Sequence, residues 1–205
     1  MTIRRGQDWG SAGALPADGV VVRTDGEARA VVEGARRSGA SLPMLGLLGG
    51  DLARTLGGRG DEDRLRSDDA RQLPVDVGSV LLDGRQFWFV AHLVARRSWW
   101  RGRIVAAMNA QYLGEWDVAP RTHPNDGRLE LVDVDPSFRV GDRLKARRRL
   151  PSGTHVPHPG IGEQRVAAWQ ATFNPALRVW LDGQPLGPIT NVSLRVEPDA
   201  LTVVV

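Results

Sequence analysis

Hydrophobic and polar positions in the first third of the chain follow a strand period and then a helix period. Residues 19–23 form a β-branched run. Beyond it, apolar residues recur at three- and four-residue intervals, as on one face of a helix: Ala28, Val31, Val32 and Ala35. Acidic residues near its start and arginines at its end fit the polarity of a helix. The pattern therefore predicts a strand that leads into a helix over residues 27–37.

A second unit of the same kind follows. Residues 42–48 predict a buried strand, and residues 52–56 predict a short helix closed by Gly57 and Gly58. Both units have glycine and an acid at the turn, as Asp25-Gly26 and as Gly49-Gly50-Asp51. Two strand-turn-helix units indicate part of a parallel α/β domain. Two strands are too few for a stable parallel sheet by themselves.

From residue 74 the pattern changes to short apolar runs separated by turn residues. Strands are predicted at residues 75–82, 86–94, 103–112, 115–119, 129–134, 143–149, 165–172, 177–181, 192–196 and 201–205. Asp83-Gly84 and Asp182-Gly183 are predicted hairpin turns. The fold class is thus α/β plus all-β: a flexible arm over residues 1–18, a truncated α/β nucleotide-binding-like unit over 19–72, and an antiparallel β-sandwich over 73–205.

Composition narrows the classes of function. The 27 basic and 24 acidic residues leave a net charge of +3, which gives no reason to expect a nucleic-acid partner. The chain has no cysteine, which excludes disulfides, thiolate metal sites and cysteine nucleophiles. No apolar run approaches the roughly 20 residues of a membrane span, and the first residues do not resemble a signal peptide. We therefore expect a soluble, cytoplasmic protein with at most peripheral membrane contact.

The most specific motif lies between Asn109 and Val132. It reads Asn-Ala-Gln-Tyr-Leu-Gly-Glu-Trp-Asp-Val-Ala-Pro from residue 109 and His-Pro-Asn-Asp-Gly-Arg-Leu-Glu from residue 123. These segments resemble Asn-Gly-x-x-x-Gly-Gly-Gly-x-x-x-x-Pro and Asp-Asp-Gly-Leu-Leu-Asp of the diacylglycerol kinase and sphingosine kinase type of lipid kinase.

Four more partial matches to that family follow its order along the chain. Residues 24–27 resemble Gly-Gly-Asp-Gly-Thr, and residues 49–54 resemble Gly-Thr-x-Asn-Asp-Phe-Ala-Arg. Residues 153–155 resemble Gly-x-His, and residues 179–183 resemble the strand that carries Asp-Gly-Glu. The chain is therefore similar to bacterial members of this lipid kinase family, but shortened at its amino terminus and with degenerate motifs.

The resemblance implies transfer of the ATP γ-phosphoryl group to a lipid hydroxyl with Mg²⁺, in a cleft between the two domains. It places Asp182, and Gln184 in place of the family's Glu, on the acceptor side, and makes Asp126 a magnesium ligand. The nucleotide side would be formed by Asp25, Gly26, Gly49, Gly50 and Asp51.

Departures from the family pattern predict weak or lost activity. Arg23 and Thr24 replace two glycines before Asp25, and Glu27 brings a carboxylate to a loop that would bind phosphate. The amide of Gln184 cannot accept a proton from a hydroxyl at neutral pH, and such a base typically contributes about 10²–10⁴ in rate. The family's carboxyl-terminal return to the nucleotide domain is not recognised in this sequence either.

These residues also have plainer interpretations. Asp25 could cap the helix that begins near Glu27, and Asp126 and Asp182 could be ordinary turn residues. Gly49-Gly50 could bind an anion or be a simple loop. His123, His155 and His158 lack the helix-face spacing of a zinc site, and residues 155–158 are expected to form a rigid surface loop.

The loop at residues 96–103 combines arginines with Trp99 and Trp100. Such a loop could enter a lipid interface or bind a phosphorylated head group, or it could be a solvated loop with one buried tryptophan. Three hypotheses stay open: a lipid kinase-like protein with weak or lost activity, a non-catalytic lipid- or partner-binding module, and a homodimer in which a second chain completes the small α/β sheet.

Overall fold

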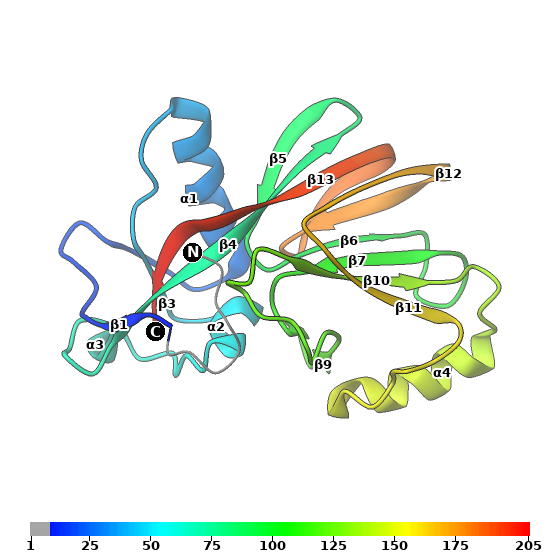
Figure 1. Cartoon of the computed structure of the whole chain (residues 1–205), viewed down its shortest axis with the longest axis horizontal. Coiled ribbons are helices and arrows are strands. Elements are labelled where there is room, and N and C mark those ends of the chain that lie inside the picture. The colour runs from blue at the N-terminus through cyan, green and yellow to red at the C-terminus, as the bar shows by residue number, and fades with distance from the viewer. Residues whose placement is uncertain (1–8) are drawn as a thin grey trace.

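The computed structural model describes residues 9–205 (Figure 1). The first part contains β1 (Ser11–Ala12), β2 (Val20–Val22), α1 (Asp25–Ser38), β3 (Leu45–Leu47), α2 (Asp51–Thr55) and α3 (Glu62–Leu65). The second begins with β4 (Arg71–Leu82), β5 (Arg85–Phe89), β6 (His92–Arg96), β7 (Ile104–Met108), β8 (Tyr112–Leu113), β9 (Trp116–Asp117) and β10 (Leu129–Val134). It ends with α4 (Val140–Arg149), a 3-10 turn (Leu150–Ser152), β11 (Ile161–Val166), β12 (Ala168–Leu181) and β13 (Gln184–Val204).

One mostly antiparallel sheet connects most of the molecule. Its strand order is β1-β4-β13-β12-β6-β7-β10-β11, with β5 on β4, and β3 and then β2 beside β13. The sheet carries one apolar cluster inside the sandwich and another on the outer face of β6, β7 and β10. Side chains alternate between them: Leu93 and Ala95 point inward, and Val94 between them points outward. The mostly antiparallel sandwich is the predicted fold class.

The small α/β part is built as its sequence predicts. β2 and β3 pair in parallel, with Val20 opposite Leu45, and α1 packs on them through Ala28 and Val32. Thr24 is the N-cap of α1, and its side chain accepts a hydrogen bond from the N–H of Glu27 at 3.1 Å. A short strand leading into a capped helix is therefore a local consequence of this sequence.

β13 corrects the expectation that no carboxyl-terminal segment returns to the nucleotide domain. Val203 and Val204 pair in parallel with Leu45 and Gly46 of β3. The same strand pairs antiparallel with β4 from Val192 to Val204. β13 therefore runs from the sandwich into the α/β part and gives the small sheet a third strand from the same chain (Figure 1).

Two other segments differ from the prediction. Residues 143–149 were expected as a strand but belong to α4, whose arginines, lysine, leucine and alanine are good helix formers. Within the predicted arm, residues 1–8 lie outside the described part of the chain. Beyond them, β1 pairs with β4, and Leu15 is buried against Leu65, so these residues are packed.

The two predicted hairpin turns are confirmed. Asp83 and Gly84 join β4 to β5, and Asp182 and Gly183 join β12 to β13. All four residues have positive φ, between 46° and 81°, which is the geometry of a tight two-residue turn. The second turn brings Asp182 to the start of α1, where the candidate site forms.

Candidate functional site

A cavity of about 350 Å³ lies where the α/β part meets the sandwich. It is lined by Thr24, Asp25, Gly26, Gly50, Asp51, His92, Leu113, Asp182, Gly183 and Gln184. Six of the residues predicted from the sequence therefore surround one space. The lining contains three carboxylates and one imidazole but neither lysine nor arginine, so its side chains favour a cation over an anion.

Asp25 caps a different helix from the one expected. Its carboxylate accepts hydrogen bonds from the backbone N–H groups of Asp51, at 2.6 Å, and Leu52, at 3.1 Å. These are the first residues of α2, whose own N-cap, Gly50, has no side chain to offer. Burial and the nearby charge of Asp182 raise the pKa of Asp25 to about 6. Asp25 therefore joins the starts of α1 and α2.

The two glycines before α2 permit this close contact. Gly50 has φ +97°, and a Cβ there would lie 2.5 Å from Oδ1 of Asp25. A Cβ on Gly49 would lie 2.6 Å from the carbonyl oxygen of Arg23. The loop thus needs glycine to let Asp25 approach its backbone. The N–H groups that a phosphate would need are those that bind this carboxylate.

Asp51, which is partly buried, pairs with the buried His92, a residue that the sequence did not single out. Oδ2 of Asp51 lies 3.0 Å from Nε2 of His92, and the N–H of Gly114 donates to both carboxylate oxygens at 3.0 Å. Burial by itself lowers the pKa of His92, but the bond to Asp51 and the neighbouring carboxylates raise it overall. Burial likewise raises the pKa of Asp51, yet His92 and Gly114 lower it overall.

Asp182 organises the junction between β5 and β6. Its carboxylate accepts hydrogen bonds from the N–H groups of Val90, at 2.8 Å, and of Ala91 and His92, both at 2.9 Å. Burial raises its pKa, although His92 and the three N–H groups act against that shift. The neighbouring Gln184 packs at the start of α1, where a Cβ on Gly26 would lie 3.4 Å from its side chain.

The only three-residue metal-ligating group in the described chain is Asp25, Asp51 and His92, whose ligand atoms all lie within 4.8 Å of one another. The magnesium implied by the family resemblance requires oxygen ligands in near-octahedral geometry. Here one of the three donors is an imidazole, and both carboxylates already accept backbone N–H bonds. The donor set does not fit Mg²⁺.

Asp126 and two of the three predicted histidines have local partners elsewhere. Asp126 accepts from the N–H of Arg128 and pairs with Arg165, and it does not line the cavity. His123 packs against Trp9 with tilted ring planes, and the ring centroids lie 4.7 Å apart. His158 packs against Phe138 in the same way and at the same distance. These contacts account for all three side chains by packing or pairing.

A second cavity, of about 260 Å³, lies between α4 and the outer face of the sandwich. Val94, Ala106 and Val132 of β6, β7 and β10 form its floor, and Trp99, Trp100 and Trp116 form part of its wall. Leu113 lines both cavities, so the two are adjacent. His155 also lines this cavity and is only 4% exposed, whereas Pro157, in the same predicted surface loop, is exposed.

Comparisons with known proteins agree with the motif-based resemblance. Residues 79–205 match the family described as the YegS C-terminal NAD kinase beta sandwich-like domain. A comparison with curated proteins finds no match. A solved structure named as a diacylglycerol kinase from Bacillus anthracis str. Sterne is 16% identical with a TM-score of 0.62, covering 91% of this chain and 75% of that chain.

Two further structures from the same organism carry the diacylglycerol kinase name as a provisional assignment. Their TM-scores are 0.69 and 0.68 at 15% and 14% identity, and each comparison covers 91% of this chain and 77% of that chain. At such identities the likeness establishes a shared fold. Separately, no helix in the described part of the chain is long and apolar enough to cross a membrane.

Proposed function

The chain belongs to the family of the YegS C-terminal NAD kinase beta sandwich-like domain, and we propose that it is a lipid-binding, kinase-like member in which ATP-dependent phosphoryl transfer is weak or lost. One observation carries this proposal: the polar groups at the candidate site bind one another. Asp25 binds the first N–H groups of α2, Asp51 binds His92, and Asp182 binds three N–H groups of the β5–β6 junction.

Electrostatics of the cavity support weak nucleotide binding. Phosphoryl transfer depends on positioning the phosphates and neutralising their charge. The lining residues of this cavity supply three carboxylates and no cationic side chain except His92 when it is protonated. The residue at the position of the family's base is Gln184, which cannot accept a proton. Membership of a family named after NAD kinase keeps nucleotide use as the hypothesis to test.

Nucleotide binding is the first prediction. We expect calorimetric titration with Mg-ATP to give no saturable heat up to millimolar nucleotide, because the site repels phosphate. Gln184→Glu should then add no lipid phosphorylation, and Gln170→Glu, which makes the same charge change on the exposed part of β12, is its control. Saturable heat together with a gain of about 10²-fold or more in transfer for Gln184→Glu alone would overturn the proposal of weak or lost transfer.

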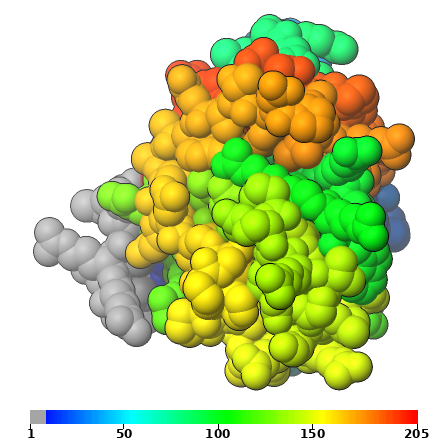
Figure 2. All heavy atoms as spheres, turned by 90° about the vertical axis from the view of Figure 1, so that its right-hand side faces the viewer, coloured from blue at the N-terminus to red at the C-terminus, as the bar shows by residue number. Residues whose placement is uncertain are grey.

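Peripheral membrane contact is the other part of the proposal, and α4 supports it. Three of the four exposed large apolar residues of the described chain are Trp100, 37% exposed, Val140, 48% exposed, and Leu144, 42% exposed. Val140, Leu144 and Arg147 follow the i, i+4, i+7 spacing of one helix face, and the guanidinium of Arg147 lies 5.2 Å from the ring centre of Trp100. The patch therefore combines apolar side chains with a cation. The yellow-green residues of α4 lie on the face of the molecule that Figure 2 shows.

A matched pair of leucines tests this contact. Leu144 and Leu81 are both 42% exposed, but Leu81 lies on β4, away from α4. Leu144→Ala and Trp100→Ala should each reduce sedimentation with anionic phosphatidylglycerol vesicles several-fold, and Leu81→Ala should leave it unchanged. Neutral phosphatidylcholine vesicles should bind weakly, because the cations of α4 need anionic partners. Failure of the wild type to sediment would exclude membrane contact.

A further inference from the structure

The cavity under α4 has the dimensions and lining of a site for a single hydrocarbon chain. Its volume of about 260 Å³ is below the roughly 300–1,000 Å³ of most small-molecule pockets, which favours one chain over two. Val94, Ala106 and Val132 lie on three hydrogen-bonded strands in register. From these the lining continues to Ile104 and Val134, further along β7 and β10. Arg143 also lines the cavity at this end, but its guanidinium is already bonded to the carbonyl groups of Phe138, Gly102 and Asp135. The groups left to contact a ligand at this end are therefore mainly apolar.

The other end, near β9, has a cation at its wall. The guanidinium of Arg147 lies 5.2 Å from the ring centre of Trp100 and 5.7 Å from that of Trp116, the first residue of β9. Among the described residues, Arg147 has no acidic partner and no hydrogen-bond acceptor for its side chain, whereas the neighbouring Arg143 donates to the carbonyls of Phe138, Trp99, Gly102 and Asp135. The N–H groups of Arg147 are therefore available to an anion.

His155 supplies a second polar group at the same end. Burial lowers the pKa of its imidazole, against the opposing effects of the charge of Asp117, the second residue of β9, and of a contact with the backbone of Val118, so the ring is neutral at pH 7. Neither ring nitrogen makes a hydrogen bond of normal geometry, although the side chain is almost wholly buried. Buried polar groups in folded proteins nearly always have partners. Two such nitrogens in the wall of a cavity indicate that a polar group of a ligand belongs beside them.

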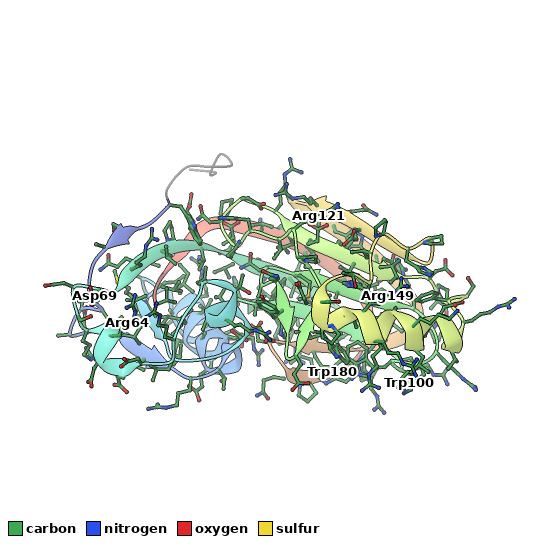
Figure 3. All side chains as sticks on the ribbon, turned by 90° about the horizontal axis from the view of Figure 1, so that it is seen from below. Arg64, Asp69, Trp100, Arg121, Arg149 and Trp180 are labelled. Atoms are coloured by element: carbon green, nitrogen blue, oxygen red, sulfur yellow. The ribbon has the colours of Figure 1, made fainter. Side chains whose placement is uncertain are left out.

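We propose that this cavity binds a long-chain fatty acid, with its carboxylate between Arg147 and His155 and its chain along β6, β7 and β10 toward Ile104. The site rests on the lipid-binding function proposed above and specifies its ligand as a single-chain carboxylate. A carboxylate accepts from the guanidinium of Arg147 with one oxygen and from an imidazole N–H of His155 with the other. Trp100, near α4 in Figure 3, lies at the wall where the carboxylate would enter.

Tryptophan quenching by a dibrominated octadecanoic acid tests this assignment, because three tryptophans line the cavity. Wild type should show saturable quenching. Arg147→Gln and His155→Leu should each weaken binding about tenfold, a change expected when one charge-assisted or buried hydrogen bond is lost. Arg148→Gln, on the same helix but outside the cavity lining, should bind as tightly as wild type. Ala146→Phe, which places a ring in the cavity from α4, should abolish quenching.

The head group is tested with the corresponding brominated alcohol and monoacylglycerol. The acid should bind at least tenfold more tightly than either, and its binding should raise the pKa of His155 measured by NMR. If the neutral lipids bind as tightly as the acid and Arg147→Gln has no effect, the fatty-acid assignment fails while lipid binding stands. If none of the brominated lipids quenches wild type, the assignment fails, and the proposed lipid-binding function fails with it if wild type also does not sediment with vesicles.

Discussion

Replacing Asp182 by alanine is expected to lower the free energy of unfolding by at least about 3 kcal/mol, since each buried donor left without an acceptor costs about 1–3 kcal/mol. Three donors are involved: the N–H groups of Val90, Ala91 and His92, all bonded to this carboxylate. Alanine also fits poorly at φ +48°, where aspartate is tolerated. The raised pKa of Asp182 shows that burying its charge costs free energy, and alanine removes this cost. The gain offsets part of the loss, but the three N–H groups still lack an acceptor.

Asp83 provides the matched control for this experiment. It occupies the same position in an Asp-Gly hairpin turn, at φ 46°, and also accepts backbone N–H bonds, from Thr190 and Asn191. Those donors are exposed, so water replaces the carboxylate when it is removed. Urea unfolding followed by tryptophan fluorescence should therefore show a much larger loss for Asp182→Ala than for Asp83→Ala. Equal losses would show that Asp182 acts only as a turn residue.

Asp182 also shows why a local prediction can be right and incomplete. Asp-Gly between two apolar runs predicts a hairpin turn, and the turn is present because its geometry depends on two adjacent residues. The three N–H groups that its carboxylate binds come about 90 residues earlier in the chain. No periodicity or spacing within the sequence connects the two segments. The same reason explains why His92 was not recognised as the partner of Asp51.

Strand positions were predictable where turn residues bound a short apolar run. β10 follows the predicted residues 129–134 because its side chains alternate between two apolar layers. α4 was mistaken for a strand because its few apolar residues give little helical signal among many arginines. Its place is fixed partly by Arg143, whose guanidinium binds carbonyl groups from other segments. That interaction is long-range, and local spacing cannot reveal it.

The candidate site could be predicted as a set of residues but not as a set of contacts. Order along the family motifs led to Asp25, Asp51 and Asp182, which do line one cavity. Their roles in catalysis stay predictions. One available signal was overlooked: Thr24 and Glu27 have the Ser/Thr-x-x-Glu spacing of a capping box. Thr24 does cap α1, which leaves Asp25 free to reach α2.

Stability should fall as pH rises through the titration of Asp25, and Asp25→Asn should remove that fall. The pKa of Asp25 is 3.8 in the unfolded chain and about 6 in the folded protein, so the folded state holds the proton more tightly. The resulting stabilisation is full below pH 3.8 and is lost as pH rises through about 6. A shift of this size corresponds to about 2–3 kcal/mol between pH 4 and pH 8.

Other groups titrate in or near this range, so the difference between the two proteins is the quantity to measure. The raised pKa of His92 also makes stability fall with rising pH, above its ordinary value of 6.5, and Asp51, with a lowered pKa, acts in the opposite sense below 3.8. In urea titrations from pH 4 to pH 8, wild type should lose about 2–3 kcal/mol relative to Asp25→Asn. Asparagine keeps one acceptor for the N–H groups of α2, and its cost is the same at every pH. Parallel stability curves would mean that the carboxylate of Asp25, which caps α2, is ionised in the folded protein throughout this range.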